Sequence, residues 1–327
     1  MRRVATGVLA LFVVALLATT VAAGATTARW CNGAARLCGR SLSAVAFATT
    51  HNSMASLADG FRPPNQRWSF AAQLGHGVRG FQIDAYLGVR RGSRVYTDLS
   101  GSLGDASELP PAFVSAALRL HRRLGAPPAG TAYDVYLCHV FCELGAVPMV
   151  DEMRMLRGFL HRHPDELVVV VIEDHVPTDR IAAVLRDAGL APKLLPVADP
   201  SALPTLGDML SSGHPLQVSL ENGDGGPTLP NAFAALVQET PFTFRRPRDL
   251  EAASSCRTNR GVDGAPVFQF NHWVTPAEHL TAQRVNSSVL RERLGRCAAA
   301  RGRGPTLVAV DFAEQGDVLG VVERLNR

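Results

Sequence analysis

Short runs of apolar, β-forming residues recur along the chain, and several of them end at a polar or charged residue. The run Ser43–Thr50 precedes His51, and the run Val78–Ile83 precedes Asp84. Continuous apolar runs of this kind predict parallel strands that are buried on both faces. The same pattern recurs in Asp134–Cys138 before His139, Leu167–Ile172 before Glu173, Leu216–Leu220 before Glu221, Val267–Phe270 before Asn271 and Thr306–Val310 before Asp311.

Helical spacing of apolar residues lies between several of these runs and indicates an alternating β/α chain. The predicted helices are Pro148–His163, Thr178–Ala188 and Val285–Arg301. We place an eighth strand at 193–197, where flanking prolines obscure the pattern. About 300 residues and about eight β/α units predict a TIM-type α/β barrel in a single domain. The alternative is a doubly wound open sheet, but no glycine-rich turn follows the first strand.

The first residues are typical of an export signal. Arg2 and Arg3 precede the apolar run Val8–Ala23, and small residues close it at 23–25. We therefore predict a signal peptide over residues 1–25, the barrel domain over residues 26–327, and a secreted protein. The alternative is an uncleaved membrane anchor, because about 17–25 apolar residues can span a bilayer.

The six cysteines indicate disulfide bonds, as expected for an exported chain. A metal-cluster interpretation is weaker, since no Cys-x-x-Cys pair is present. Pairing of nearest neighbours is the simplest connectivity: Cys31 with Cys38, Cys138 with Cys142, and Cys256 with Cys297.

The charge is too balanced to favour a nucleic acid partner. The formal net charge of +4 includes Arg2 and Arg3, so without them it is +2. Lys193 is the only lysine. A phosphate clamp in this chain must therefore use arginine, backbone N–H groups or a metal ion.

In a TIM-type barrel the carboxyl ends of the strands form one rim, and the active site lies there. Taken singly, a histidine after a strand is more often a loop or capping residue, and a carboxylate more often caps a helix. Two histidines and three carboxylates on one rim favour a catalytic site instead. The residues expected to converge are His51, Asn52, Asp84, His139, Glu173 and Asp311.

Two histidines suit a reaction that removes one proton and delivers another near neutral pH. Cleavage of a phosphodiester by an internal hydroxyl is such a reaction, and the charge on the phosphate oxygens must be met by a cation. Asn52, Asp84 and Glu173 offer the hard oxygen ligands that Ca²⁺ prefers. The residues thus predict a two-histidine phosphodiesterase with Ca²⁺ as the candidate cofactor.

At these residues the chain resembles the X domain of phosphatidylinositol-specific phospholipases C. Ala48-Thr-Thr-His-Asn-Ser53 resembles the signature that opens that domain, and the resemblance runs from about Ala44 to Phe312. The chain is also similar to secreted PLC-like phosphodiesterases, including plant forms. Further similar segments are 73–84 for the second strand, Leu137-Cys-His139 for the second histidine, 171–175 for the fourth strand, Phe270-Asn-His272, and Ala309-Val-Asp311-Phe.

The resemblance implies that His51 is the general base for the inositol 2-hydroxyl and His139 the general acid for the leaving glycerol oxygen. It also places Asn52, Asp84 and Glu173 on the Ca²⁺-ligand positions of the metal-dependent branch. We further expect Asp311 to orient His51 through its other ring nitrogen, as in triad-like sites, or alternatively to cap a helix.

Two residues depart from the family pattern. Gln82 stands where the metal-dependent branch has a carboxylate ligand, and Tyr86 stands where the metal-free bacterial branch has an arginine. The metal requirement is therefore open. The lack of lysine also argues against the multi-lysine pocket of enzymes that act on phosphorylated inositides.

The leading hypothesis is a monomeric phosphodiesterase that acts on a phospholipid or another phosphodiester and contacts a membrane surface transiently. One alternative is a glycerophosphodiesterase or a barrel of the sphingomyelinase D type, and another is a non-catalytic lipid-binding barrel. Asn271 and His272 are candidates for substrate contact, and Trp68, Phe70 and Trp273 for lipid contact or for the core.

Overall fold

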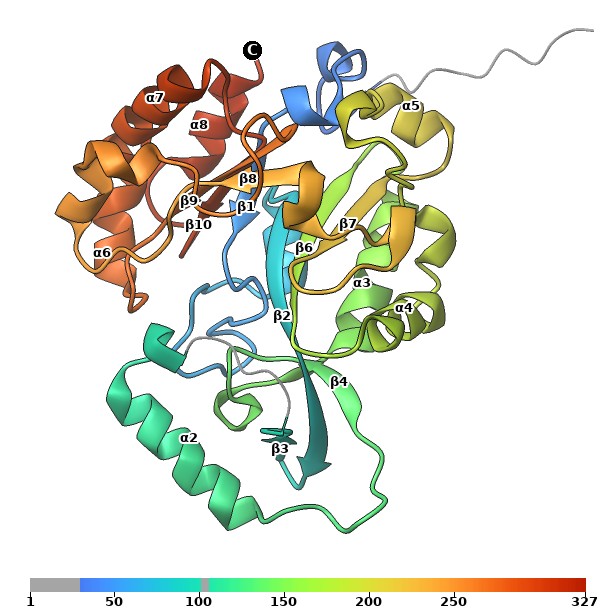
Figure 1. Ribbon diagram of the computed structural model, residues 1–327, viewed down its shortest axis with the longest axis vertical. Helices are drawn as coiled ribbons and strands as arrows, with labels where there is room; N and C mark the ends of the chain where they lie inside the picture. The colour runs from blue at the N-terminus through green and yellow to red at the C-terminus, as the bar shows by residue number, and fades with distance from the viewer. Residues whose placement is uncertain (1–29, 101–105) are drawn as a thin grey trace, which may run out of the picture.

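The computed structural model describes residues 30–100 and 106–327. The predicted signal peptide, residues 1–25, lies outside the described residues. In the described part of the chain, no helix is both long and apolar enough to cross a bilayer. Figure 1 shows a curled sheet flanked by helices, with an insertion that projects beyond one end of the strands.

Seven parallel strands form the centre of the sheet, in the order β8-β9-β10-β1-β2-β6-β7. Six of them coincide with apolar runs recognised in the sequence. Their bounds are β1 (Phe47–Thr50), β2 (Gly80–Arg91), β6 (Val168–Asp174), β7 (Leu216–Leu220), β8 (Val237–Glu239), β9 (Val267–His272) and β10 (Leu307–Val310).

Strand β6 shows why the continuous apolar runs become parallel strands. Residues 168–172 are each no more than 1% exposed. Val168, Val170 and Ile172 pack in one hydrophobic cluster together with residues of the flanking helices, whereas Val169 and Val171 belong to a second cluster. Because successive side chains point to opposite faces, a strand covered on both faces must be apolar throughout.

The sheet is curled, but no ladder joins its end strands β7 and β8 among the described residues. Near this seam the bridge between Leu220 and Asn231 is isolated. The predicted eighth strand at 193–197 is not formed, and Leu194 makes only an isolated bridge to Leu216. Pro192 and Pro196 cannot donate to a ladder, which explains this outcome. The expected curled α/β sheet is present, whereas a closed barrel is not established.

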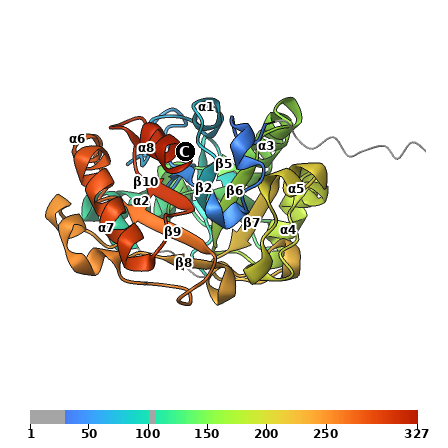
Figure 2. The same cartoon turned by 90° about the horizontal axis from the view of Figure 1, so that it is seen from above.

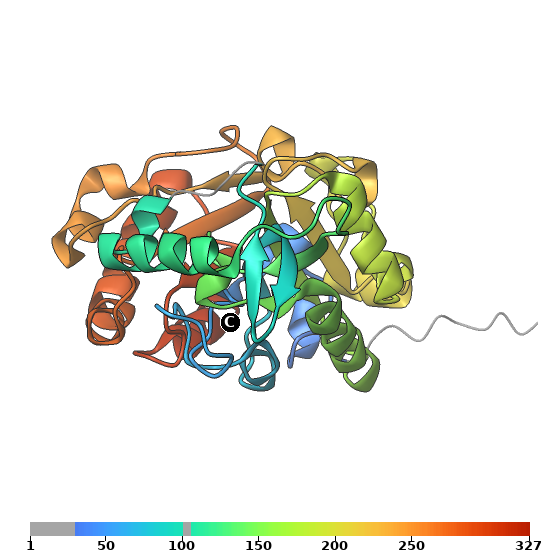
Figure 3. The same ribbon diagram turned by 90° about the horizontal axis from the view of Figure 1, so that it is seen from below.

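The predicted third barrel strand, Asp134–Cys138, belongs instead to an insertion. Strand β2 continues past the rim and pairs antiparallel with β3 (Arg94–Thr97) and β4 (Asp134–Leu137), and β5 (Val147–Pro148) pairs with β4. Helix α2 (Pro111–Leu124) lies beside this hairpin (Figure 3). An apolar run predicts burial but not strand direction, so the sequence pattern could not reveal the antiparallel pairing.

In the view of Figure 2, α3, α4 and α5 lie toward the β7 end of the curled sheet, and α6 and α7 lie toward the other end. Two predicted helices agree with α3 and α4 to within two residues. The third, Val285–Arg301, is divided, because a π-helical turn with non-helical backbone at Ser287 precedes α7. The bounds are α1 (Phe70–Gly75), α3 (Met149–Arg162), α4 (Thr178–Asp187), α5 (Leu206–Ser211), α6 (His279–Arg284), α7 (Leu290–Arg301) and α8 (Val318–Leu325).

The three predicted disulfides are present. They join Cys31 to Cys38, Cys138 to Cys142, and Cys256 to Cys297. The second closes the loop that carries His139, and the third ties the segment after β8 to α7.

Candidate active site

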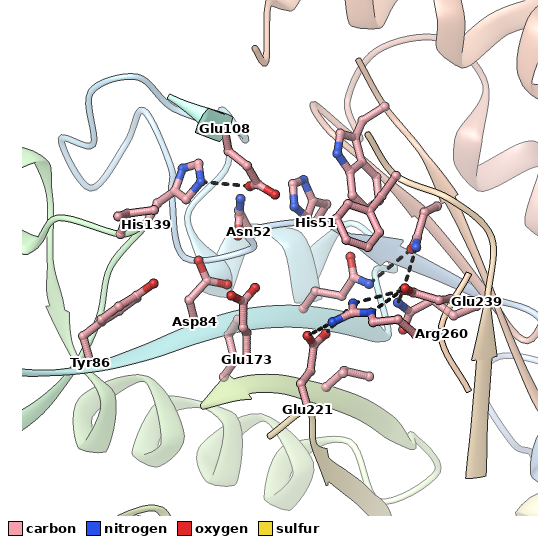
Figure 4. A pocket seen from close by; sticks show the side chains of 18 residues that line it. His51, Asn52, Asp84, Tyr86, Glu108, His139, Glu173, Glu221, Glu239 and Arg260 are labelled. Carbon is pink, nitrogen blue, oxygen red and sulfur yellow. Dashed lines mark hydrogen bonds and ion pairs between the residues drawn. The ribbon is translucent and has the colours of Figure 1, made fainter. Parts of the chain in front are cut away.

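The predicted site residues meet at the carboxyl ends of the parallel strands (Figure 4). Asp84 and Glu173 are register partners on β2 and β6. His139 arrives from the insertion, because β4 runs back toward the rim and pairs Leu137 with Ala85. Five of the six residues line one pocket, and Asp311 lies behind one of them: the five are His51, Asn52, Asp84, His139 and Glu173.

His51 is held by a carboxylate and by an aromatic ring. Its Nδ1 lies 2.9 Å from Asp311 Oδ1, and Asn65 Nδ2 donates to the same oxygen at 3.1 Å. The His51 ring stacks on Trp273 with 3.7 Å between centroids and 8° between planes. Burial opposes protonation, but the charge and hydrogen bond of Asp311, together with the charges of Glu108 and Glu173, outweigh it, so the pKa of His51 is raised. The ring is therefore fixed with Nε2 directed toward Asn52.

His139 is held by a second carboxylate. Its Nε2 lies 3.2 Å from Oε2 of Glu108, which belongs to a short 3₁₀ turn, Ala106–Glu108. Burial tends to raise the pKa of Glu108, but the hydrogen bond from His139 and the charge of His51 lower it overall. Glu108 is thus an ionised partner of His139, and no sequence pattern had singled it out.

Asn52 lies between the two histidines and Asp84. With its amide turned so that Nδ2 faces Asp84, it donates to both carboxylate oxygens at 3.0 Å. Its Oδ1 then lies 3.2 Å from His51 Nε2 and 3.3 Å from His139 Nε2. The two imidazoles therefore direct the same ring nitrogen toward one point of the pocket.

Left-handed backbone at non-glycine residues is concentrated around this site. Asn52 has φ 44°, Val140 beside His139 has φ 61°, and Phe312 beside Asp311 has φ 48°. Such conformations cost about 1–3 kcal/mol each and persist where surrounding contacts enforce them. The local turns therefore fix the direction of both histidines and of Asp311.

Asp84 and Glu173 form an acidic wall of the pocket. Burial, and then the charge of Glu173, raise the pKa of Asp84 well above its usual value. Glu173 Oε1 lies 2.7 Å from His175 Nε2. Asp174, the next residue, instead accepts from the backbone of the loop at Asn222 and so shapes the rim.

Asp84 and Glu173 supply only part of a metal coordination shell. Within residues 30–100 and 106–327, no group of three or more His, Cys, Asp or Glu side chains is arranged to hold a metal. Asn52 supplies a third oxygen beside Asp84 and Glu173 when its amide is turned the other way. Since Ca²⁺ takes about six to eight oxygen ligands, such an ion would keep several waters or substrate oxygens.

An arginine and two glutamates form the opposite end of the pocket. Arg260 Nη1 lies 2.7 Å from Glu221 Oε2, and its Nε lies 2.5 Å from Glu239 Oε1. Asn271 Nδ2 donates to Glu239 at 2.8 Å. Burial outweighs the opposing charge of Arg260 and raises the pKa of Glu221 to about 7. Glu221 and Asn271 carried the strand-end signal in the sequence, whereas Arg260 lies in a loop without one.

The two residues that depart from the family pattern both line the pocket. Gln82 Nε2 lies 3.5 Å from Asn271 Oδ1, and its Oε1 has no hydrogen-bond partner in the described part of the chain. Tyr86 stacks on His175 with 4.4 Å between ring centroids. Neither residue brings a charge to the pocket.

The expected substrate contact of His272 is wrong, because its side chain is fully buried outside the pocket. Its Nε2 lies 3.0 Å from the carbonyl oxygen of Val285, and burial followed by the charge of Arg293 lowers its pKa to about 3. Phe70 is a core residue that stacks on Phe81. Trp68 stacks on His76, the residue that follows α1.

Comparisons with known proteins point to one family. The family model described as PI-PLC X 1 matches residues 122–326, a range that includes His139 and Glu173. The chain is 26% identical over 218 residues to a PI-PLC X domain-containing protein of Arabidopsis thaliana, covering 59% of this chain and 49% of that protein. It is also 26% identical over 216 residues to PI-PLC X domain-containing protein 1 of Arthroderma benhamiae, covering 58% and 68%. The chain thus spans about half the length of the Arabidopsis relative.

Among solved structures, the fold is similar to a phosphatidylinositol-specific phospholipase C from Staphylococcus aureus. The TM-score is 0.51 at 12% identity, and the alignment covers 88% of this chain and 94% of that one. At this identity the likeness concerns the fold alone. Together with the family match over residues 122–326, it establishes that the chain belongs to the PI-PLC X family and has a PLC-like phosphodiesterase fold.

Proposed function

We propose that the chain is a phosphoric diester hydrolase that cleaves a phosphoinositide or a related diester by two-histidine acid–base catalysis. One observation carries this proposal: His51 and His139 each lie against a carboxylate and direct Nε2 toward the same atom of the Asn52 side-chain amide, at 3.2 and 3.3 Å. An acid and a base on two sides of one small site are what an in-line displacement at phosphorus requires.

In the first step, His51 Nε2 takes the proton of a hydroxyl that neighbours the phosphodiester, and this oxygen attacks phosphorus. His139 gives its Nε2 proton to the leaving alcohol oxygen as the phosphorus–oxygen bond breaks. The products are an alcohol and a cyclic phosphate. Water can then open the ring with the two histidines in exchanged roles, which restores the starting protonation of both.

The negative charge of the phosphate needs a positive partner in this pocket. Arg260 is already engaged by Glu221 and Glu239, so its charge is not available without breaking buried ion pairs. We propose that Asn52, Asp84 and Glu173 hold Ca²⁺, which when bound would stabilise charge on the phosphate oxygens. Asp84 and Glu173 are register partners on neighbouring strands, so their carboxyl groups are adjacent, which supports this assignment.

The head group that best fits the remaining pocket is an uncharged polyol. Gln82 Oε1 and Gln269 Oε1 are buried acceptors without partners in the described chain, and Glu221 and Glu239 add carboxylate oxygens. Such acceptors attract hydroxyl donors and repel a second phosphate.

A quaternary ammonium head group, as the sphingomyelinase-type alternative requires, fits less well. Cation–π recognition needs open aromatic faces. The Trp273 face is stacked by His51, and Arg260 lies 5.0 Å above the Phe242 ring. The pocket therefore favours inositol-like over choline-like substrates.

The test is a panel of phosphatidylinositol, its bisphosphate, phosphatidylcholine and glycerophosphodiesters, with product release measured for the wild-type protein and for His51→Ala and His139→Ala. We expect release from phosphatidylinositol and a loss of about 10²–10⁴-fold in each variant. Full activity in both variants, or cleavage of none of the diesters, would overturn the proposal. A protein that binds lipid vesicles equally well with and without the histidines, and turns over nothing, would support the non-catalytic alternative.

Calcium dependence is tested separately. We expect Ca²⁺ to raise the rate and a chelator to lower it. We also expect Asp84→Asn to raise the dissociation constant for Ca²⁺ measured by calorimetry. Unchanged rates in chelator, with no calorimetric binding, would remove Ca²⁺ from the mechanism while leaving the acid–base proposal in place.

We also propose that the protein is secreted after cleavage near residue 25. Its three disulfides suit an oxidising compartment. Sequencing the amino terminus of protein recovered from the culture medium of the expressing cells tests this proposal.

A further inference from the structure

The loop between β1 and α1 returns to the catalytic rim at two buried polar residues, Asn65 and Gln66. Asn65 is 4% exposed and Gln66 is 1% exposed. A buried amide side chain needs hydrogen-bond partners, and in a loop it commonly finds them on the backbone of that loop. The side chains of these two residues bond instead to the strand ends that carry the proposed base and its carboxylate partner.

We propose that Asn65 and Gln66 are positioning residues, which hold His51 and Asp311 in the arrangement that the proposed base requires. The inference rests on the proposed function, because it concerns how the base of that reaction is held. Neither Asn65 nor Gln66 is among the described residues that line the catalytic pocket, so both act through the residues they bond to.

Gln66 joins the end of β1 to the end of β10 through both ends of its amide. Its Nε2 donates to the carbonyl oxygen of His51 at 2.8 Å and to that of Val310 at 3.1 Å, and its Oε1 accepts from Ala313 N at 3.1 Å. The two strands are parallel neighbours in the sheet (Figure 1). One side chain therefore fixes the peptide after His51 and the backbone on both sides of the turn that contains Asp311.

Asn65 holds the carboxylate of the same turn and its backbone. Its Nδ2 donates to Asp311 Oδ1 at 3.1 Å, and this is the oxygen that lies 2.9 Å from His51 Nδ1. The carbonyl oxygen of Asn65 accepts from Phe312 N at 2.8 Å, and its N–H donates to the Ala55 carbonyl oxygen at 2.8 Å. A carboxylate can rotate about its single bonds, so a second donor on the same oxygen keeps that oxygen directed at the imidazole.

These contacts fall at two turns with left-handed backbone. Asn52, which follows the proposed base, has φ 44°, and Phe312, which follows the carboxylate partner, has φ 48°. Such backbone persists where the surrounding contacts enforce it. Gln66 bonds to the carbonyl oxygen of the peptide that precedes Asn52, and Asn65 accepts from the N–H of Phe312. The two residues thus supply contacts that enforce both turns.

The position of His51 sets the rate of the proposed first step. A general base must lie within hydrogen-bond reach of the proton that it takes, and a misplacement of about 1 Å can cost about 10²-fold in rate. Loss of the link between the two strand ends should therefore slow the chemical step. Binding of the substrate, which uses other side chains, should change little.

The experiment compares Gln66→Met with wild type on a 4-nitrophenyl inositol phosphodiester, whose absorbance change allows low rates to be measured. Methionine has a similar length but forms none of the three hydrogen bonds. We expect kcat to fall about 10–100-fold and KM to change less than about 3-fold. In the His51→Ala background the same substitution should lower the remaining rate less than about 2-fold, because no imidazole is left to position.

Two further variants separate positioning from folding. Asn65→Ala keeps the backbone bonds of the loop and removes the donor to Asp311, so kcat should fall about 3–10-fold with His51 present and less than about 2-fold without it. It decides the question if Gln66→Met does not fold. Gln238→Met is the matched control, since Gln238 is a buried glutamine outside the pocket lining whose Nε2 donates to the Ala265 carbonyl oxygen at 3.0 Å. It should lower the urea midpoint of unfolding and leave kcat unchanged.

Equal losses with and without His51 would overturn this inference, because general damage to the fold lowers both rates alike. Unchanged kcat in both Gln66→Met and Asn65→Ala, or a rise in KM alone, would also overturn it and leave the two-histidine proposal intact. If the wild-type protein cleaves no diester, the proposed function fails, and the assigned roles of Asn65 and Gln66 fail with it. Circular dichroism and urea unfolding establish that each variant was folded in the assay.

Discussion

The pair formed by Asp311 and His51 yields the most direct prediction, because replacing Asp311 by asparagine removes one charge and little volume. The two atoms are 2.9 Å apart, and their side chains are 12% and 4% exposed, so solvent screens the interaction weakly. Asn65 Nδ2 donates to the same Asp311 oxygen and would still find an acceptor in the variant. The substitution therefore tests the charge and leaves most of the geometry unchanged.

The magnitude follows from the hydrogen bond. A bond to a charged partner contributes about 1.5–3 kcal/mol, which corresponds to about 10–150-fold in rate if it is made in full only in the transition state. In the proposed mechanism His51 becomes positively charged as it takes the proton, so Asp311 stabilises the transition state more than the resting state. We expect kcat/KM of Asp311→Asn to fall within this range near neutral pH.

The pH dependence has a definite sign. The Asp311 carboxylate raises the pKa of His51 against the opposing effect of burial, so the wild-type base is available only above that raised value. Without the charge the pKa of His51 falls. The acidic limb of the kcat/KM profile should then move to lower pH, and the loss of rate should be smallest at low pH.

The assay is the pH profile of kcat/KM with a soluble inositol phosphodiester, for wild type, Asp311→Asn and Asp187→Asn. Asp187 is 60% exposed at the end of α4 and provides a carboxylate-to-amide change outside the pocket. An acidic limb that stays in place or moves to higher pH in Asp311→Asn would refute the assigned pairing. An equal shift in Asp187→Asn would point to a general charge effect.

Three further predictions concern stacking, acid stability and disulfides. Trp273→Leu removes the ring stacked on His51 at 3.7 Å, so kcat/KM should fall about 3–10-fold, with partial recovery in Trp273→Phe; equal rates in all three proteins would contradict a role for stacking. Burial lowers the pKa of His272 to about 3, so as the pH falls below about 6.5 this histidine takes up a proton in the unfolded state before it does so in the folded state. The free energy of unfolding should therefore fall by about 1.4 kcal/mol per pH unit because of this residue. In urea unfolding, His272→Gln should lose less stability than wild type between about pH 6.5 and 5. Replacing Cys256 and Cys297, which are 41 residues apart, by alanine should cost about 4 kcal/mol of unfolding free energy, against about 2.5 kcal/mol for Cys31 and Cys38, which are 7 apart; the reverse order in urea unfolding would argue against loop entropy as the cause.

The sequence predicted those parts of the fold in which a local pattern determines the outcome. Strands such as β6 and β7 were recognised because burial on both faces requires an unbroken apolar run. The insertion was missed for the opposite reason. Asp134–Leu137 has the same apolar character, but its antiparallel pairing to an extended β2 depends on where the chain turns after residue 91. Strand β8 has three residues, too few to show a recognisable pattern of apolar positions in the sequence.

The site shows the same division between local and non-local information. His51 and Asp311 follow β1 and β10, and Asp84 and Glu173 lie where the parallel pairing of β2 and β6 ends. Parallel strands bring these ends together, so the convergence of the four residues followed from topology. Glu108 follows no strand and reaches His139 through contacts between α2, its preceding turn and the His139 loop. No residue near Glu108 signals such a contact in sequence, because the partners are 31 positions apart and on separate elements.

Because Gln82 and Tyr86 replace a carboxylate ligand and an arginine of the family pattern, the sequence does not identify the cation that neutralises the phosphate. The charges of the pocket favour one candidate. Arg260 is the arginine that lines it, and it faces two carboxylates, so that end of the pocket is already negative overall. Asp84 and Glu173 place two more carboxyl groups at the other end, and burial, followed by the charge of Glu173, raises the pKa of Asp84. A phosphodiester entering this surrounding would be repelled unless positive charge entered with it. In the proposed mechanism, His139 carries the proton for the leaving group and so supplies one such charge there. Among the described residues that line the pocket, Arg260 is already paired, so we propose that a bound cation meets the non-bridging oxygens and that the oxygen atoms of Asn52, Asp84 and Glu173 hold it.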